Sequence, residues 1–160
     1  MIRKVVPEDA AAIASIYNEY ILHSVITFDT APVSESDMRS SILDISARFP
    51  YFVYEDKGKV VGFCYAHPWK GKAAYRHTLE TTLYLMPDVK GRGLGTQLME
   101  RLMAECRAGG YKVLIACITE GNTVSESFHR KLGFTKVSHF TKVGFKFNRL
   151  LDVVDYELVL

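Results

Sequence analysis

Apolar residues recur along this chain at two spacings, one typical of strands and one typical of amphipathic helices. Short runs of β-branched and aromatic residues predict strands over residues 1–6, 51–54, 59–66, 76–85 and 113–117, with further strands between 134 and 160. Apolar residues at three- and four-residue intervals predict a helix that opens at Pro7 and includes Ile21, and helices over 34–48, 94–107 and 122–132. Strands and helices mixed in this order predict an α/β fold.

The predicted boundaries carry start and stop signals of the expected kinds. Pro7 suits the first turn of a helix, where its missing N–H would have no partner, and Ser34 suits an N-cap. The segment 56–58 predicts a hairpin turn, and Gly133 predicts the end of a helix. Residues 113–117 are continuously apolar, which predicts a central strand covered on both faces.

Length and composition indicate one globular domain over residues 1–160. A chain of this length can bury about 70% of its unfolded surface, and 48% hydrophobic and 24% charged residues are ordinary for a globular protein. The 20 basic and 18 acidic residues give a net charge of +2, which argues against a nucleic-acid partner. No apolar run approaches the ~20 residues of a membrane span, so no membrane partner is expected.

Cysteine usage adds an expectation about compartment. Cys64, Cys106 and Cys117 lie inside apolar segments and lack the spacing of metal ligands. They predict buried thiols in a reducing compartment, and no bound metal. Acidic residues soon after the first basic ones interrupt any signal-peptide core, so a cytoplasmic protein is expected.

Three glycines at alternate positions, Gly91, Gly93 and Gly95, connect the predicted strand 76–85 to the predicted helix 94–107. Without Cβ atoms they allow positive φ angles and let a ligand approach the backbone closely. The first amides of a helix have no intrahelical partners and lie at the positive end of the helix dipole. The segment therefore predicts a phosphate or pyrophosphate site, while a turn that only caps the helix remains open.

Three common glycine-loop patterns do not fit this segment. A P-loop requires G-x-x-x-x-G-K-[ST], and no Lys follows the glycines here. The dinucleotide fingerprint G-x-G-x-x-G places its third glycine one residue later and usually lies near the first strand of a domain. The protein-kinase loop requires catalytic Asp and metal-binding Asn motifs that are missing from this chain.

Two segments in order along the chain point to coenzyme A. The segment 90–95, Lys-Gly-Arg-Gly-Leu-Gly, resembles the [QR]-x-x-G-x-[GA] signature with which the GNAT acetyltransferase superfamily holds the pyrophosphate of coenzyme A. Residues 122–134 resemble the second segment of that superfamily, N-x-x-S/A-x-x-x-Y/H-x-x-x-G-F. The resemblance implies the GNAT fold, a mixed and mostly antiparallel central sheet flanked by helices, with acetyl-CoA as co-substrate.

A third segment narrows the resemblance. Residues 75–84, Tyr-Arg-His-Thr-Leu-Glu-Thr-Thr-Leu-Tyr, are similar to the Y-R-x-T-x-E-x-S-x-Y segment of the phosphinothricin and methionine sulfoximine N-acetyltransferases. Residues 16–20, 27–29 and 143–147 match the same group, so the resemblance covers essentially the whole chain. It implies acetyl transfer from acetyl-CoA to the amine of a small amino-acid-like acceptor, and a homodimer. The apolar segment 153–160 would lie at the dimer interface, or would be an internal strand.

Glu80 is the candidate general base. Acetyl transfer to an amine requires a group that takes a proton from the ammonium, and Glu80 lies on a predicted strand. Thr78, Glu80 and Thr82 share one face of that strand, while Thr81 and Leu83 face the other side. Partial burial would raise the pKa of the carboxyl group and make it a better base. The alternative is a strand-edge glutamate paired with Arg or Lys.

Candidate groups on the predicted helix 122–132 follow from the resemblance. His129 stands where many superfamily members have a Tyr that is proposed to protonate the departing thiolate, and it equally suits a packing role. Asn122 would bind the pantetheine or cysteamine part of coenzyme A, and it also suits an N-cap. Ser125 is a further candidate for coenzyme contact.

The coenzyme site is expected to consist largely of backbone. The peptide groups of three strand residues would pair with the pantetheine amides as another strand would, and the glycine segment would hold the pyrophosphate. Lys90 stands where the superfamily has Gln or Arg, which keeps a charge but loses a planar donor group. The predicted coenzyme-binding set is Leu83, Tyr84, Leu85, Lys90, Gly91, Arg92, Gly93, Leu94, Gly95, Thr96, Asn122 and Ser125.

The acceptor would carry a carboxylate, and Arg76 is the candidate that binds it, with a surface strand-edge residue as the alternative. Phe28, Tyr75 and Thr78 are expected to complete the acceptor site. Two departures from the family pattern concern this site, because His77 replaces a Trp and Leu150-Leu151 stands where a Trp is usual. Another amine, such as a polyamine, an aminoglycoside or a peptide N-terminus, and a non-catalytic acyl-CoA sensor, are the alternative functions.

Overall fold

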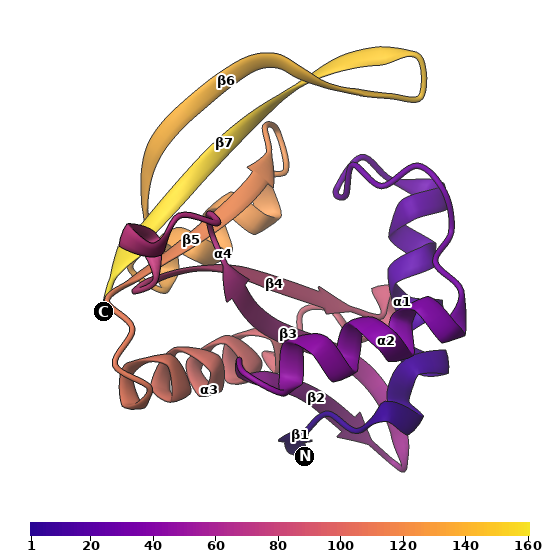
Figure 1. Cartoon of the computed structure of the whole chain (residues 1–160). Helices are drawn as coiled ribbons and strands as arrows, with labels where there is room; N and C mark the ends of the chain where they lie inside the picture. Colours follow the sequence, from indigo (N-terminus) through magenta and orange to yellow (C-terminus); the bar gives the residue numbers. More distant parts are fainter.

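One seven-stranded sheet with the order β1-β2-β3-β4-β5-β7-β6 organises the computed structural model, which describes all residues 1–160 (Figure 1). Every neighbouring pair of strands is antiparallel except β4 and β5, which are parallel. This arrangement confirms the predicted α/β fold with a mixed, mostly antiparallel sheet. The strands are β1 (Ile2–Lys4), β2 (Tyr51–Asp56), β3 (Lys59–Pro68), β4 (Thr78–Leu85), β5 (Val113–Thr119), β6 (Thr135–Lys146) and β7 (Arg149–Val159).

Four helices connect the strands, close to the predicted ranges: α1 (Ala10–His23), α2 (Glu35–Ser46), α3 (Leu94–Ala108) and α4 (Thr123–Lys131). Pro7 opens a short 3-10 turn that leads into α1. The predicted N-cap of α2 is confirmed, because the Ser34 hydroxyl accepts a hydrogen bond from the Asp37 amide at 3.1 Å. The predicted strand start at Arg76 was wrong by two residues, because a 3-10 turn over Ala73–Tyr75 precedes β4.

The helices cover the two faces of the sheet unequally. α1 and α2 pack on one face, where their apolar residues form a core with Tyr51, Val53 and Phe63. α3 packs on the opposite face, where Leu98, Leu102 and Cys106 join buried residues of β3, β4, β5 and β7. In Figure 1, α1 and α2 lie over the half of the sheet that holds β1 to β4. The face of β5 and β7 on that side has no helix over it.

This unequal cover corrects the prediction for β5 and Cys117. Cys64 and Cys106 are buried as predicted, but Cys117 is exposed. Its neighbours Ala116 and Ile118 point to the face covered by α3 and are buried. Cys117 points to the other face, which has no helix over it at β5. The unbroken apolar run over residues 113–117 therefore does not mean that both faces of this strand are covered.

β4 and β5 separate part of the way along their length. Their pairing is limited to Thr78–Glu80 against Val113–Ile115, whereas β4 stays paired with β3 as far as Leu85. The Thr81 hydroxyl donates to the Ile115 carbonyl at 3.4 Å where the ladder ends. Beyond this point the β5-facing edge of β4 is free, and residues 83–85 are only half-buried in the middle of the sheet.

β6 and β7 form a long hairpin that arches away from the other strands (Figure 1). The register of the hairpin shifts between Phe140 and Gly144. Asp152 stabilises this irregularity, because its carboxylate accepts hydrogen bonds from the Lys142 amide at 2.8 Å and from His139 Nε2 at 2.7 Å. Since β7 is paired on both sides, the segment 153–160 is an internal strand rather than an outer surface.

The hairpin is attached to the connection between α1 and α2. Lys146 is buried, and its ammonium donates a hydrogen bond to the Thr27 carbonyl at 2.8 Å. The ring of Phe28 occupies the space that a Cβ atom on Gly144 would need. Glycine at 144 is therefore required for this contact.

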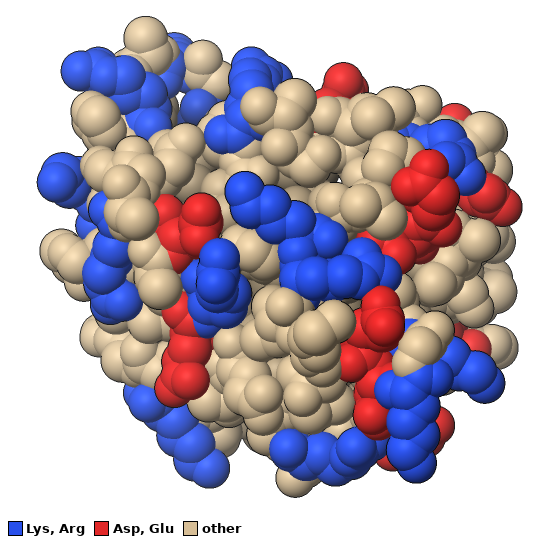
Figure 2. Space-filling view, turned by 90° about the horizontal axis from the view of Figure 1, so that it is seen from below, with Lys and Arg blue, Asp and Glu red and all other residues tan.

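The charged surface is mixed. Figure 2 shows Lys and Arg interspersed with Asp and Glu on the face seen from below. None of the helices has the length and apolar character needed to cross a membrane.

Candidate active site

Glu80 lies at the point where β4 and β5 separate. Its register partner on β3 is His67, and His67 Nε2 lies 4.0 Å from Glu80 Oε1. The Glu80 side chain is 29% exposed, so it can meet a ligand although most of it is enclosed. Burial raises the pKa of the Glu80 carboxyl, while His67 lowers it and Asp155 raises it further. A half-buried carboxyl group in this state is suited to accept a proton near neutral pH.

Glu80 shares its face of the sheet with side chains that the sequence did not connect to it. Cys117 on β5 and Asp155 on β7 are register partners, and they project on the same side as Glu80. The sequence did not predict that His67, Cys117 and Asp155 lie on the face of Glu80. Only the strand register brings them together, and a single strand pattern does not reveal the register of its partners.

The glycine segment forms a tight turn at the start of α3. Gly91 and Gly93 both have φ of 77°, which confirms the expected positive φ angles. Gly93 is the N-cap of α3 and provides no side-chain cap, so the first amides of the helix remain available to a ligand. Gly95 packs on the end of β4, with the position of a Cβ atom 3.5 Å from Leu83 and Leu85. An alanine would fit there, whereas Gly91 and Gly93 need glycine for their conformation.

The two basic residues of this segment have different neighbours. The Arg92 guanidinium forms an ion pair with Asp56 at 3.1 Å, across from the hairpin turn between β2 and β3. The Lys90 ammonium lies 4.8 Å from the ring centre of Tyr20, and the Tyr20 hydroxyl donates to the carbonyl of Leu85. Lys90 is thus held close to the free edge of β4.

α4 begins beside this opening. Asn122 caps the helix, and its side-chain oxygen accepts a hydrogen bond from the Ser125 amide at 3.3 Å. This confirms the predicted cap and leaves the side-chain NH2 free for a ligand. A surface cavity of about 560 Å³ combines Asn122 with Thr119 and Glu120 from the end of β5 and with the connection after α1.

His129 is buried on α4 and lies between aromatic rings. Its ring is perpendicular to those of Phe128 and Phe134, at centroid distances of 5.2 and 5.1 Å. Nδ1 lies 2.8 Å from the Ser125 carbonyl, and because a carbonyl only accepts, Nδ1 carries a hydrogen. Burial lowers the pKa of His129, although this hydrogen bond raises it. A neutral imidazole of this form has no proton on Nε2, which favours the packing role.

The predicted acceptor residues lie in two places. Tyr75, Arg76 and Thr78 lie at the start of β4, close in sequence to Glu80, where Tyr75 packs edge-on against Trp69 at 5.3 Å. Phe28 lies against the hairpin. The next residue, Asp29, accepts a hydrogen bond from Tyr17, whose ring meets that of Tyr84 on β4.

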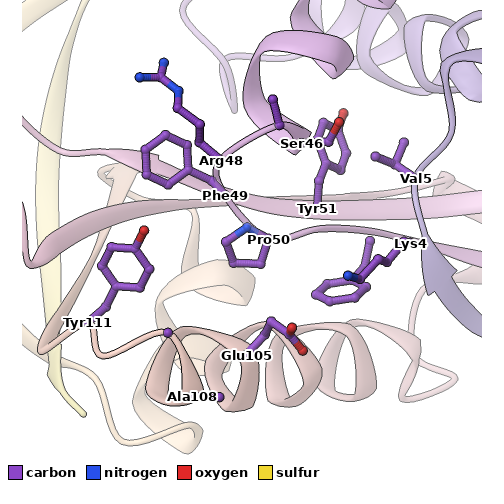
Figure 3. Close-up of a pocket in the computed structure, with 13 residues that line it drawn as sticks. Lys4, Val5, Ser46, Arg48, Phe49, Pro50, Tyr51, Glu105, Ala108 and Tyr111 are labelled. Atoms are coloured by element: carbon purple, nitrogen blue, oxygen red, sulfur yellow. The ribbon is translucent and has the colours of Figure 1, made fainter.

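A larger cleft of about 650 Å³ lies elsewhere, between the end of α2, the start of β2 and the end of α3 (Figure 3). Figure 3 shows Arg48, Phe49, Pro50 and Tyr111 around it. None of the predicted site residues lines this cleft. The positions of the predicted site residues therefore favour the opening between β4 and β5, rather than this cleft, as the candidate active site.

Comparisons with known proteins agree with the geometry. The model of the acetyltransferase (GNAT) family matches residues 13–134. The chain is 36% identical over 155 residues to the phosphinothricin N-acetyltransferase of Alcaligenes faecalis, covering 96% of this chain and 79% of that protein. It is 34% identical over 154 residues to the L-methionine sulfoximine/L-methionine sulfone acetyltransferase of Salmonella typhimurium, covering 95% and 90% of the two chains.

A solved structure gives the same result. The crystal structure of a GNAT superfamily phosphinothricin acetyltransferase from Sinorhizobium meliloti, in complex with acetyl-CoA, matches with a TM-score of 0.96 and 34% identity. The match covers 100% of this chain and 88% of that one. The coenzyme in that protein's structure identifies the ligand class that this fold accommodates.

Proposed function

Because the chain belongs to the acetyltransferase (GNAT) family and is an N-acetyltransferase, we propose that it acetylates the amine of a small amino-acid-like acceptor, of the phosphinothricin or methionine sulfoximine type. The observation that carries the proposal is the half-buried Glu80, at the point where β4 and β5 separate. Relatives named for such acceptors align with almost the whole chain, which supports the same acceptor class here.

Acetyl-CoA would bind along the opening between β4 and β5. The edge of β4 at residues 83–85 has no strand partner and offers peptide groups to the pantetheine arm, in the manner of an added strand, while the Leu85 carbonyl also accepts from the Tyr20 hydroxyl. The turn at residues 90–96 and the first amides of α3 would hold the pyrophosphate, with Lys90 close by. Asn122 and Ser125 lie at the start of α4, where Asn122 has a free NH2 group for the pantetheine or cysteamine part.

Glu80 would act as the general base. In the proposed step, the acceptor ammonium transfers one proton to Glu80, and the neutral amine nitrogen then bonds to the carbonyl carbon of the thioester. The carbon–sulfur bond breaks, its electron pair goes to sulfur, and the sulfur takes a second proton. The raised pKa of Glu80 supports this role, because it brings the basicity of the carboxylate closer to neutral pH.

His129 is the side chain predicted to supply the proton for sulfur. Its Nδ1 hydrogen is committed to the Ser125 carbonyl, so only Nε2 could serve, and it would first have to be protonated. A proton from the amine itself, passed directly or through water, needs no such step. The test is His129→Gln: a proton donor would lose turnover, whereas a packing residue would lose mainly thermal stability.

Arg76 would bind the acceptor carboxylate at the start of β4, with Tyr75, Thr78 and Phe28 around the acceptor. Arg76 is exposed and precedes Glu80 by four residues. The amine and the carboxylate of such an acceptor share one α-carbon, so the long Arg76 side chain would have to extend along β4 toward Glu80 to bind the carboxylate. A guanidinium can bind a carboxylate through two parallel hydrogen bonds, which fixes orientation as well as charge.

We also propose a homodimer and a cytoplasmic location. The hairpin of β6 and β7 exposes large apolar side chains, which is unusual for a surface that stays in water. They are Phe140, Val143, Phe145, Phe147 and Leu150. The three free cysteines, one of them exposed, support a reducing compartment.

The test is a thiol-release assay with acetyl-CoA and a panel of amines that includes phosphinothricin, methionine sulfoximine, common amino acids, a polyamine and an aminoglycoside. Stimulation by the amino-acid-like amines, with the acetylated product found by mass spectrometry, is the expected result. Binding of acetyl-CoA without stimulation by any amine would instead support a sensor. Sedimentation analysis tests the dimer.

A further inference from the structure

The strand register relates the position of Asp155 on β7 to that of Glu80 on β4. Ile115 is the register partner of Glu80, Cys117 follows two residues later on the same face, and Asp155 is the partner of Cys117. Residues in register, and residues two apart on one strand, project to the same side of a sheet. Asp155 therefore lies on the face of Glu80, one strand beyond β5.

The exposure of the two strands shows that this face is open there. Val154 and Tyr156 are buried on the other face, whereas Asp155 is half-buried and Cys117 is exposed. No helix covers Asp155 on the side of Glu80, because α1 and α2 pack with β2 and β3. A ligand that reaches Glu80 can therefore also reach Asp155.

The carboxylate of Asp155 has no cationic partner in the protein. Its contact is the Cys117 thiol, and none of the salt bridges includes it. Two other half-buried or buried carboxylates show the usual alternative, since Asp152 pairs with His139 and Glu126 with Arg130. A partly enclosed carboxylate without a counter-charge is unfavourable unless a ligand supplies one.

We propose that Asp155 is a positioning and specificity residue of the acceptor site, and that it holds the ammonium group of the acceptor beside Glu80. This proposal rests on the proposed function and adds to it. It implies that the acceptor binds in its protonated form, between two carboxylates, before Glu80 takes the proton. Amines that are neutral at the working pH are then poorer acceptors than amines that are protonated.

The surroundings of Glu80 support this role. The titratable groups on its face are His67 and Tyr65 from β3, Cys117 from β5, and Asp155 and Glu157 from β7. Of the two carboxylates on β7, Asp155 is the one whose charge raises the pKa of Glu80. Burial is the main reason that the pKa of Glu80 is raised, and the charge of Asp155 adds to it. Removing the charge of Asp155 should therefore weaken acceptor binding and also lower the pKa of the base.

The experiment compares Asp155→Asn with the wild-type enzyme in the thiol-release assay, over a pH series. The acceptor KM should rise about tenfold, as expected for the loss of one charge-assisted contact. The KM for acetyl-CoA should stay the same. The acidic limb of the kcat/KM profile should move to lower pH, which the loss of a purely structural residue would not cause.

Two control variants separate the proposed contact from general charge effects. Asp155→Glu keeps the charge, so the acidic limb should stay in place. Asp44→Asn removes one charge from the exposed surface of α2, and should leave the acceptor KM and the limb unchanged. The thermal unfolding midpoint of each variant reports whether its fold is intact.

Distinct results overturn this proposal and the proposed function. A wild-type enzyme that acetylates no amine contradicts the proposed function. An active wild type, with unchanged acceptor KM and pH profile in a folded Asp155→Asn variant, contradicts the role of Asp155. Equal effects of Asp155→Asn and Asp44→Asn contradict it as well, since they would show a response to total charge.

Discussion

The two sides of the opening between β4 and β5 differ in whether backbone or side chains would contact a ligand. The proposed coenzyme side consists mainly of backbone, namely the unpaired edge of β4, the turn at residues 90–96 and the first turns of α3 and α4. The proposed acceptor side consists of side chains, with Glu80, His67 and Asp155 projecting from three different strands. A backbone site depends on conformation and is insensitive to most side-chain changes. A side-chain site can be changed one residue at a time.

The largest effect should come from the acceptor side. Glu80→Gln removes the proposed base but keeps the size of the side chain, so kcat should fall about 100-fold or more, in the range of general base catalysis. The Kd of acetyl-CoA should stay within about twofold. Steady-state kinetics and isothermal titration calorimetry measure the two quantities, and a variant with full activity at all pH values would remove Glu80 from the mechanism.

On the coenzyme side, Gly93→Ala should weaken acetyl-CoA binding by about tenfold. The substitution forces a residue with a Cβ atom into a left-handed conformation, which costs roughly 1–2 kcal/mol and disturbs the amides that would hold the pyrophosphate. The comparison is between the KM values for acetyl-CoA of the variant and the wild type.

Gly110 provides a matched control for this strain. Its φ of 81° is close to that of Gly93, a Cβ atom would meet nothing within 4 Å at either position, and Gly110 lies beyond the C-terminal end of α3. Gly110→Ala should lose similar stability and keep the wild-type KM for acetyl-CoA. Equal losses of coenzyme affinity in both variants would argue against a pyrophosphate site at residues 90–96.

A smaller effect is expected at the edge of the acceptor side. Arg76→Gln should raise the KM of a carboxylate-bearing acceptor about fivefold, because the exposed guanidinium is well solvated and its ion pair is correspondingly weak. The matched amine that lacks the carboxylate should show no change. The same increase for both amines would place Arg76 outside the carboxylate site.

The smallest effect concerns stability and its pH dependence. The pKa of Glu80 is raised in the folded protein, so the charged form is less favourable there than in the unfolded chain. Glu80→Gln should therefore stabilise the protein slightly at pH values above the folded pKa. The difference should disappear below the unfolded pKa, where both forms are neutral. Thermal unfolding at pH 8 and pH 4 checks the sign.

The contrast between the two sides also explains which features of the site could be predicted from the sequence. The coenzyme side depends on local signals, since Gly91, Gly93 and the Asn122 cap are neighbours in sequence of the elements that they shape. The positive φ angles and the helix starts could therefore be predicted. The strand pattern also placed Glu80 on one face of its strand with Thr78 and Thr82.

The other features of the site depend on the register of the strands and on which parts of the sheet the helices cover. A local sequence pattern reports neither. His67 meets Glu80 only because β3 pairs with β4 in one register, and Asp155 joins them through β5. Cys117 was expected to be buried because its strand is apolar, yet its exposure depends on where α1 and α2 stop covering the sheet. These are properties of the assembled sheet.

The separation of the two sides can be measured directly with the double variant Gly93→Ala/Glu80→Gln. If coenzyme binding and proton removal are independent, the losses in kcat/KM of the single variants multiply in the double variant, as for sites without shared contacts. We expect agreement within about threefold. A double variant no worse than Glu80→Gln alone, at subsaturating acetyl-CoA, would contradict the division of the site into a backbone side and a side-chain side.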